Sequence, residues 1–256
     1  CQSSTTGYSF GYVGFTSPPN PANAKLVQKY TFASNTSVEL VGAISLWSTS
    51  GSVATNSSTH GYQLGGTTAA GEGGVSKLSF ATEAPMTEVG DAYNGTSSTG
   101  IQYGSPHASL THGYRAGGAS SVSVQSIEKW AFASDANSAF VANMVRGVDN
   151  PSAGGSSDYN GYIIGGSAPS TISPFAARGC YDKFSFSSDA DSTTVGSLFH
   201  PDSYSSGTSS TTHCYMAGGG HPQVNVIQKG SFASDGNTTD VGDIIQARAY
   251  VHGYQN

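Results

Sequence analysis

Residues 226–237 read VIQKGSFASDGN, and residues 241–244 read VGDI. Related segments occupy residues 26–42, 75–90, 127–142 and 181–196, so the pattern is present five times. The same aromatic residue anchors every copy, and successive anchors are 48, 52, 54 and 46 residues apart; the anchors are Phe32, Phe80, Phe132, Phe186 and Phe232. A period near fifty residues indicates a repeat architecture in which each copy folds as one structural unit.

Two further features recur with the anchor. A lysine stands three residues before each anchor, at Lys29, Lys77, Lys129, Lys183 and Lys229. The motif Gly-Tyr-x-x-Gly-Gly precedes the anchor at residues 61–66, 113–118 and 161–166, and residues 214–219 carry it with Cys214 in place of the first glycine. Residues 7–12 are a degraded copy.

The residue pattern within each repeat predicts four short strands. Residues 162–164 form an apolar run that ends in a double glycine, and residues 127–132 alternate apolar with polar, as a half-buried strand does. Asp and Asn in residues 135–137 favour a turn, because their side chains bond the local backbone and tolerate left-handed conformations. Residues 241–245 read as the strand that follows. Because no window shows a helical period, we predict an all-β protein.

Four strands per unit of about fifty residues, repeated around an axis, predict a β-propeller. We expect five blades, each a four-stranded antiparallel sheet, in a single domain spanning residues 1–256. The alternative is part of a six- or seven-bladed propeller. The Gly-Tyr strand occurs near both ends of the sequence, at residues 7–8 and 253–254, but a closed ring of five has room for only one copy. Either one copy is displaced at the seam or the natural protein is longer.

The double glycine at 165–166, the strand and turn at 127–137, and an arginine after the third strand (Arg146, Arg248) resemble the kelch repeat. The tryptophan of that family is absent from the third strand, so the repeats are kelch-like. The amino-acid sequence of residues 232–237, 240–244 and 210–213 is similar to repeats in marine phage structural and tail-fibre-like proteins. This resemblance implies a rigid scaffold and specifies no chemistry.

Composition excludes some function classes. Charged residues make up 10% of the chain, against about a quarter in ordinary globular domains. The net charge of −6 argues against a nucleic-acid partner, which favours a basic face. No apolar run approaches the ~18 residues of a membrane helix, so we expect no membrane span.

The three cysteines do not form a disulfide framework. We expect Cys180 and Cys214 to be buried thiols; a bridge between them is the alternative. Cys1, followed by small polar residues, resembles a lipidated bacterial N-terminus, but residues 2–8 also align with residues 208–215, which places residue 1 inside a repeat.

Several repeated polar residues invite a chemical interpretation. The five lysines suggest a cationic ring, but we favour contacts with a neighbouring turn. Repeated histidines precede the motif tyrosine, and we expect them to bond backbone at blade junctions rather than a metal; they are His60, His112, His213 and His252. Residues 235–240 and 189–191 resemble calcium loops but lack the complete ligand set. We therefore expect no metal and no cofactor.

No catalytic motif stands out. The sequence has no Gly-x-Ser-x-Gly elbow, no phosphate loop and no isolated pair of carboxylates. The tripeptide at 213–215 resembles the Tyr-Cys pair that is crosslinked in copper-radical oxidases, but it is the repeat motif with its glycine replaced. We expect a protein that is not an enzyme.

The expected function is that of a structural or attachment protein on a virion surface or outside the cell, such as a tail-fibre, decoration or appendage component. Its expected partners are a host-surface glycan, other virion proteins or further copies of itself. Five aromatic residues outside the repeat pattern are candidate sugar platforms: Trp47, Tyr93, Tyr103, Tyr159 and Tyr204. The first alternative is a secreted multivalent lectin with one site per blade. The second is a propeller-scaffold enzyme, a glycosidase or a copper oxidase.

Overall fold

The computed structural model describes residues 3–11, 26–34, 36–43, 51–65, 73–93, 101–119, 124–148, 153–167, 179–220 and 222–249. These residues contain nineteen strands and no helix, which confirms the all-β prediction for the part of the chain that is described. Every pair of neighbouring strands within a sheet is antiparallel.

The strands form five sheets, numbered here in chain order. The first contains β1 (Thr6–Gly11), β2 (Leu26–Thr31) and β3 (Thr36–Ala43). The second contains β4 (Val53–Asn56), β5 (His60–Leu64), β6 (Gly74–Ser79) and β7 (Thr87–Asp91). The third contains β8 (Ser105–Ala108), β9 (His112–Ala116), β10 (Ser126–Ala131) and β11 (Ala139–Asn143).

The fourth sheet contains β12 (Ala153–Ser156), β13 (Asn160–Ile164), β14 (Cys180–Ser185) and β15 (Thr193–Ser197). The fifth contains β16 (Ser206–Ser209), β17 (His213–Ala217), β18 (Val226–Ser231) and β19 (Thr239–Asp243). Four sheets therefore have the expected four strands. The first has three described strands, which correspond to the second, third and fourth strands of the others, because β1 carries the Gly-Tyr motif.

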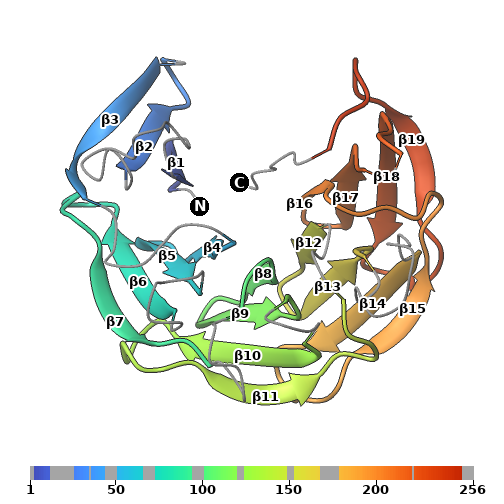
Figure 1. Cartoon of the computed structure of the whole chain (residues 1–256), viewed down its shortest axis with the longest axis horizontal. Coiled ribbons are helices and arrows are strands. Elements are labelled where there is room, and N and C mark those ends of the chain that lie inside the picture. Colours follow the sequence, from blue (N-terminus) through green and yellow to red (C-terminus); the bar gives the residue numbers. More distant parts are fainter. Residues whose placement is uncertain are drawn as a thin grey trace, which may run out of the picture.

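The sheets are arranged around a common centre, with one strand of each four-stranded sheet nearest the middle (Figure 1). These innermost strands, β4, β8, β12 and β16, contact one another in succession. The last strand of each sheet, β7, β11, β15 or β19, lies on the perimeter. Consecutive sheets lie side by side, whereas the first and fifth stand apart from each other. The arrangement is consistent with a propeller.

A register shift interrupts the pairing of the third and fourth strands at the same place in every four-stranded sheet. It falls between Ile127 and Glu128 in the third sheet and between Tyr181 and Asp182 in the fourth. A bulge of this kind bends a strand and increases its twist. The outer strand of each four-stranded sheet therefore carries one extra residue at this point and bends there.

The glycine of the Gly-Tyr motif leaves room for a large side chain on the paired strand. Gly113 is opposite Trp130 and Gly161 is opposite Phe184, and a Cβ on either glycine would lie 2.3–2.4 Å from the facing ring. In the fifth sheet the sizes are exchanged, with Cys214 opposite Gly230. The departure from the motif at Cys214 is thus compensated across the sheet.

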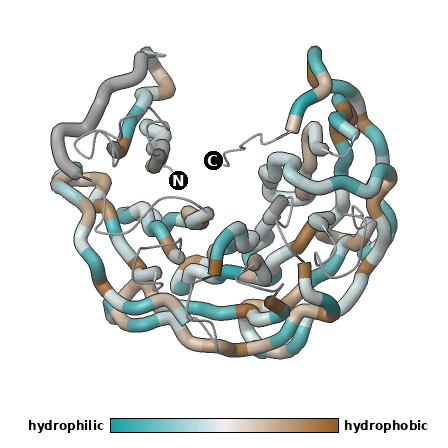
Figure 2. Tube along the Cα trace, in the orientation of Figure 1, coloured by the Kyte–Doolittle hydropathy of each residue, from teal (hydrophilic) through white to brown (hydrophobic). Residues whose placement is uncertain are grey.

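The core is divided between the sheets rather than gathered in one place. Apolar residues are spread in short segments along all the described sheets (Figure 2). They form four clusters, and each cluster joins two consecutive sheets: Tyr8 with Leu78, Tyr62 with Trp130, Tyr114 with Phe184, and Tyr162 with Cys214. The hydrophobic effect therefore stabilises sheet-to-sheet junctions directly.

Candidate functional site

The junction between consecutive sheets is the most regular feature of the molecule. The motif tyrosine of one sheet stacks on the anchor phenylalanine of the next, with ring centroids 4.7–5.0 Å apart and interplanar angles of 12–25°. The pairs are Tyr8–Phe80, Tyr62–Phe132, Tyr114–Phe186 and Tyr162–Phe232. Such pairs contribute about 0.5–1.5 kcal/mol beyond the burial of their area.

An ion pair accompanies each stack. The lysine three residues before the anchor of one sheet contacts an acid three residues after the anchor of the next. The pairs are Lys29–Glu83, Lys77–Asp135, Lys129–Asp189 and Lys183–Asp235, with Nζ and Oδ2 of the last pair 2.7 Å apart. The favoured prediction, that the repeated lysines contact a neighbouring turn, is confirmed for these four.

The acid reaches its lysine from an unusual backbone conformation. Glu83, Asp135 and Asp189 have φ values of 50°, 46° and 49°, in the left-handed region. Asp tolerates this region because its short side chain bonds the local backbone, whereas the free-energy cost of a positive φ is higher for Glu. The turn chemistry predicted from the Asp and Asn residues therefore also sets the direction of the carboxylate.

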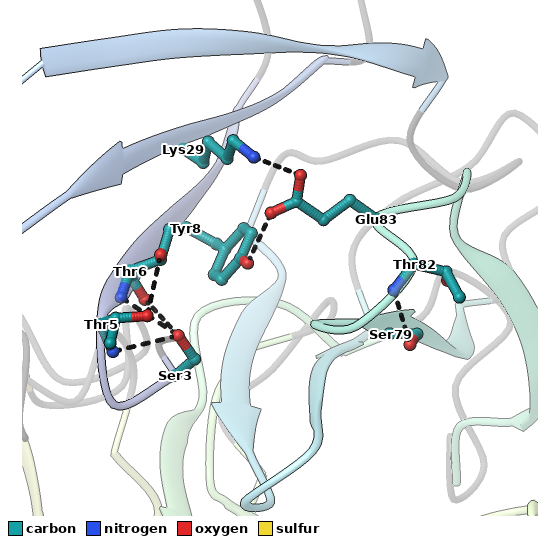
Figure 3. Close-up of polar contacts among 8 residues, drawn as sticks. All are labelled: Ser3, Thr5, Thr6, Tyr8, Lys29, Ser79, Thr82 and Glu83. Atoms are coloured by element: carbon teal, nitrogen blue, oxygen red, sulfur yellow. Dashed lines mark hydrogen bonds and ion pairs between the residues drawn. The ribbon is translucent and has the colours of Figure 1, made fainter.

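The first junction shows how the two contacts combine. Lys29 and Tyr8 of the first sheet both point to the carboxylate of Glu83, which lies in the turn after β6 (Figure 3). The Tyr8 hydroxyl donates to Glu83 Oε1 at 3.0 Å, and Lys29 Nζ donates to Oε2. Burial, and then the hydrogen bond and charge of Glu83, raise the pKa of Tyr8 to about 12. The phenol therefore stays protonated as a donor.

Backbone contacts complete the junction at the perimeter. The N–H groups at the ends of β7, β11 and β15 donate to Oδ1 of Asn137, Asp191 and Asn237 in the next sheet, at 2.7–3.0 Å. In return, the N–H groups of Ser138, Ser192 and Thr238 donate to carbonyls of the preceding outer strand. The segments that resemble calcium loops thus supply junction contacts. The described residues contain no group of three His, Cys, Asp or Glu side chains placed to hold a metal ion.

A buried polar residue of the third strand holds the loop that leaves the preceding sheet. Glu128 accepts the Tyr93 N–H at 3.0 Å and pairs with the buried Arg115, whose guanidinium donates to the carbonyls of Ile101 and Tyr93. Gln228 plays the same part for His200, accepting its N–H and donating to its carbonyl. The Glu128 carboxylate and the Gln228 amide therefore bond a backbone segment of the preceding sheet.

Arg146, matched to the kelch arginine in the sequence, also reaches the next sheet. Its Nη2 lies 3.4 Å from Asp182 Oδ1 and contacts the Thr194 hydroxyl, which itself donates to Asp182 at 2.7 Å. The side chain of Asp182 is fully buried. Arg146 therefore belongs to the junction between the third and fourth sheets.

The repeated histidines bond a side chain, not the backbone. Nδ1 of His60, His112 and His213 lies 2.8 Å from the hydroxyl of the threonine directly before each one. The prediction of backbone contacts is therefore wrong for these three, because the hairpin turn brings the threonine hydroxyl closer. Burial, and then the nearby Lys77 or Lys129, lower the pKa of His60 and His112. His252 lies outside the described residues.

The structure places Tyr159 at the other end of the hairpins from Tyr103 and Tyr204. Tyr159 lies in the β12–β13 turn with 77% of its surface exposed, whereas Tyr103 and Tyr204 lie two residues before β8 and β16, at the opposite end of the equivalent hairpins. Both have φ of 58°, and Tyr103 is 45% exposed. Tyr93 is half-buried and packs near Phe140, with centroids 5.8 Å apart. Trp47 lies outside the described residues.

Cys180 and Cys214 are free, buried thiols, so the alternative of a disulfide between them is wrong. Cys214 Sγ lies 3.2 Å from the Tyr181 hydroxyl. Burial raises the pKa of the Cys214 thiol, which keeps it in the unreactive protonated form. Its role in the structure is packing against Gly230 and Tyr181.

Sequence reasoning placed the repeated lysines against a neighbouring turn but did not identify the acid that pairs with four of them. The signal was present, because an acid follows the anchor by three residues in four of the five repeats: Glu83, Asp135, Asp189 and Asp235.

Comparison of the chain with protein-family models and with curated proteins finds no match. Within the described residues, no helix has the length and apolar character needed to cross a membrane.

Proposed function

We propose that the five sheets are consecutive blades of a β-propeller and that the protein is a non-enzymatic structural or attachment protein. One observation carries the proposal: the repeated charged and aromatic residues are used in sheet-to-sheet contacts, four times in the same geometry. The most regular chemistry of the sequence thus supports a rigid scaffold.

The residues that differ between repeats are the ones left for recognition. Tyr159 and Leu110 are exposed in hairpin turns at different positions of the repeat, and Tyr103, whose position is shared by Tyr204, is exposed before β8. Function in repeat scaffolds resides in such connecting segments. We place the protein on a virion or extracellular surface, with a host glycan or another surface protein as its partner.

A glycan array with the full chain tests this proposal. Tyr159→Ala is expected to lower affinity for the bound glycan about tenfold, which corresponds to about 1.4 kcal/mol of lost contact. Leu110→Ala is the matched control, because Leu110 is also an exposed hairpin-turn residue and has no aromatic face. Absence of binding to every glycan and to every candidate surface protein would contradict an attachment role.

The lectin alternative is favoured by a different observation. The Thr–His pair recurs with the same 2.8 Å contact at three hairpin turns, so three sheets present the same exposed polar feature. Identical sites would produce avidity beyond that of any one site. Titration calorimetry showing several equal sugar sites per chain, lost on replacement of these histidines, would favour the lectin over a single attachment surface.

A further inference from the structure

Each internal junction joins two different faces. We name the face that carries the motif tyrosine and the lysine the Tyr/Lys face, and the face that carries the anchor phenylalanine and the acid the Phe/acid face. In the second, third and fourth sheets both faces are occupied by neighbours. The Tyr/Lys face of the fifth sheet comprises Tyr215, Lys229, Val241, Gly242 and Asp243.

This face of the fifth sheet is open within the described part of the chain. Tyr215 is half-buried, whereas the four equivalent tyrosines are at most 2% exposed. Val241 is 46% exposed, and every residue of β19 is exposed. No described residue forms an ion pair with Lys229, although each of the other four lysines of the repeat has one.

The backbone of β19 also lacks the contacts with a following sheet that the equivalent strands make within the described residues. A Cβ on Gly90 or Gly196 would meet backbone atoms of the next sheet at 2.6 or 2.1 Å, but a Cβ on the equivalent Gly242 would meet nothing within 4 Å. The N–H groups that end β7, β11 and β15 each donate to a turn side chain of the next sheet. For the equivalent Asp243 N–H, the described residues supply no such acceptor.

We propose that the Tyr/Lys face of the fifth sheet is a docking surface for a sixth sheet of the same repeat type. Its anchor aromatic stacks on Tyr215, and its acid, three residues later, pairs with Lys229. The turn that follows supplies the acceptor for the Asp243 N–H. The inference rests on the proposed propeller arrangement and adds the identity of the neighbour.

Charge decides which sheet docks there. In all four internal junctions the partner carries a carboxylate three residues after its anchor, but the first repeat has Asn35 at this position of the sequence. The first repeat, from this chain or from a second copy, therefore has no carboxylate at the sequence position that pairs with the lysine in the other junctions. It also stands apart from the fifth sheet (Figure 1). The occupant is thus a repeat other than the five in this sequence.

The test inserts a second copy of residues 204–249 after Ala249 of the full chain, so that a new anchor and a new acid follow the fifth sheet. The expected result is one cooperative unfolding transition, about 5 °C above that of the starting chain. Lys229→Ala is expected to lower the midpoint of the extended protein and to leave the starting protein unchanged. The control extension carries Ala and Asn in place of its copies of Phe232 and Asp235, and should give no gain.

Three outcomes would overturn the inference. The extension gives no gain in stability; Asn35→Asp stabilises the starting chain, which would mean that its own first sheet closes on Lys229; or sedimentation shows self-association that Lys229→Ala abolishes. Lys183→Ala in the starting chain separates this inference from the proposed function. If Lys183→Ala is destabilising while the extension fails, the blades are correct and only the sixth sheet is wrong.

Discussion

Lys183 in β14 donates to both carboxylate oxygens of Asp235 in the turn after β18, at 2.9 and 2.7 Å. The two residues are 52 positions apart, which is close to one repeat. Lys183 lies three residues before its anchor phenylalanine in the sequence, and Asp235 lies three residues after its own. The same relationship links Lys77 to Asp135 and Lys129 to Asp189. The same ion pair therefore recurs once per repeat at these junctions between consecutive sheets.

Removing this ion pair is expected to have a small effect. Lys183→Ala should lower the free energy of unfolding by about 0.2–1 kcal/mol, because both side chains are partly exposed and screened by water. Lys229→Ala is the matched control and should be neutral, since no described residue pairs with it. Urea denaturation measures both, and equal losses for the two variants would contradict the assignment of the contact.

The aromatic stack should contribute far more. Tyr162→Ala removes a fully buried ring from between the fourth and fifth sheets and should cost about 3–5 kcal/mol. A double-mutant cycle with Phe232→Ala should give a coupling of about 0.5–1.5 kcal/mol. Tyr215→Ala, in the half-buried equivalent position, should cost clearly less. A loss at Tyr215 as large as at Tyr162 would contradict the open face.

The exchange of sizes between Cys214 and Gly230 predicts a rescue. Gly161→Cys in the fourth sheet should destabilise by about 1–3 kcal/mol, because the new side chain overlaps the ring of Phe184. Adding Phe184→Gly, which reproduces the fifth-sheet pairing, should recover part of the loss relative to Phe184→Gly alone. Thermal melts of the three variants check this, and strict additivity would show that the two positions do not share space.

Two buried groups predict opposite responses to pH. Burial lowers the pKa of His107 to about 4, whereas the unfolded value is about 6.5, so the unfolded chain binds more protons between those pH values. This contribution to stability is full above pH ~6.5 and is lost as the pH falls toward 4. Burial raises the pKa of Asp202 to about 7, above its unfolded value near 4, so its contribution falls as the pH rises through that range.

Variants separate the two contributions. Stability of His107→Gln should rise less steeply than that of the parent protein between pH 4 and 6.5, because a proton-linked cost has been removed. Stability of Asp202→Asn should rise more steeply in the same range. Urea midpoints across this pH range measure both slopes. The same slope change for both variants would contradict the opposite signs.

Much of the scaffold is predictable because its signals are local. The Phe spacing and the double glycine predict the number of sheets correctly, and the alternation at residues 127–132 correctly predicts a strand, which is β10 (Ser126–Ala131). The contact with a neighbouring turn was also predicted correctly for four of the five repeated lysines. These features depend on residue type and spacing within one repeat, which the sequence displays directly.

The rest depends on geometry between repeats. Tyr159 and Tyr103 are both aromatic residues outside the pattern, yet one lies in a hairpin turn and the other before an inner strand, at opposite ends. The Thr–His contact depends on the shape of a turn, and the compensation of Cys214 by Gly230 depends on strand register. Neither can be read from spacing alone, because the partner is fixed by the fold.

A crystal structure of the chain tests the central claim most directly. The account predicts sheets arranged around one centre, with Tyr162 stacked on Phe232 and Lys183 within hydrogen-bonding distance of Asp235. It predicts the same contacts at the three preceding junctions. Sheets packed face to face as a two-layer sandwich or stacked in a line, with the lysines away from the acids, would contradict it.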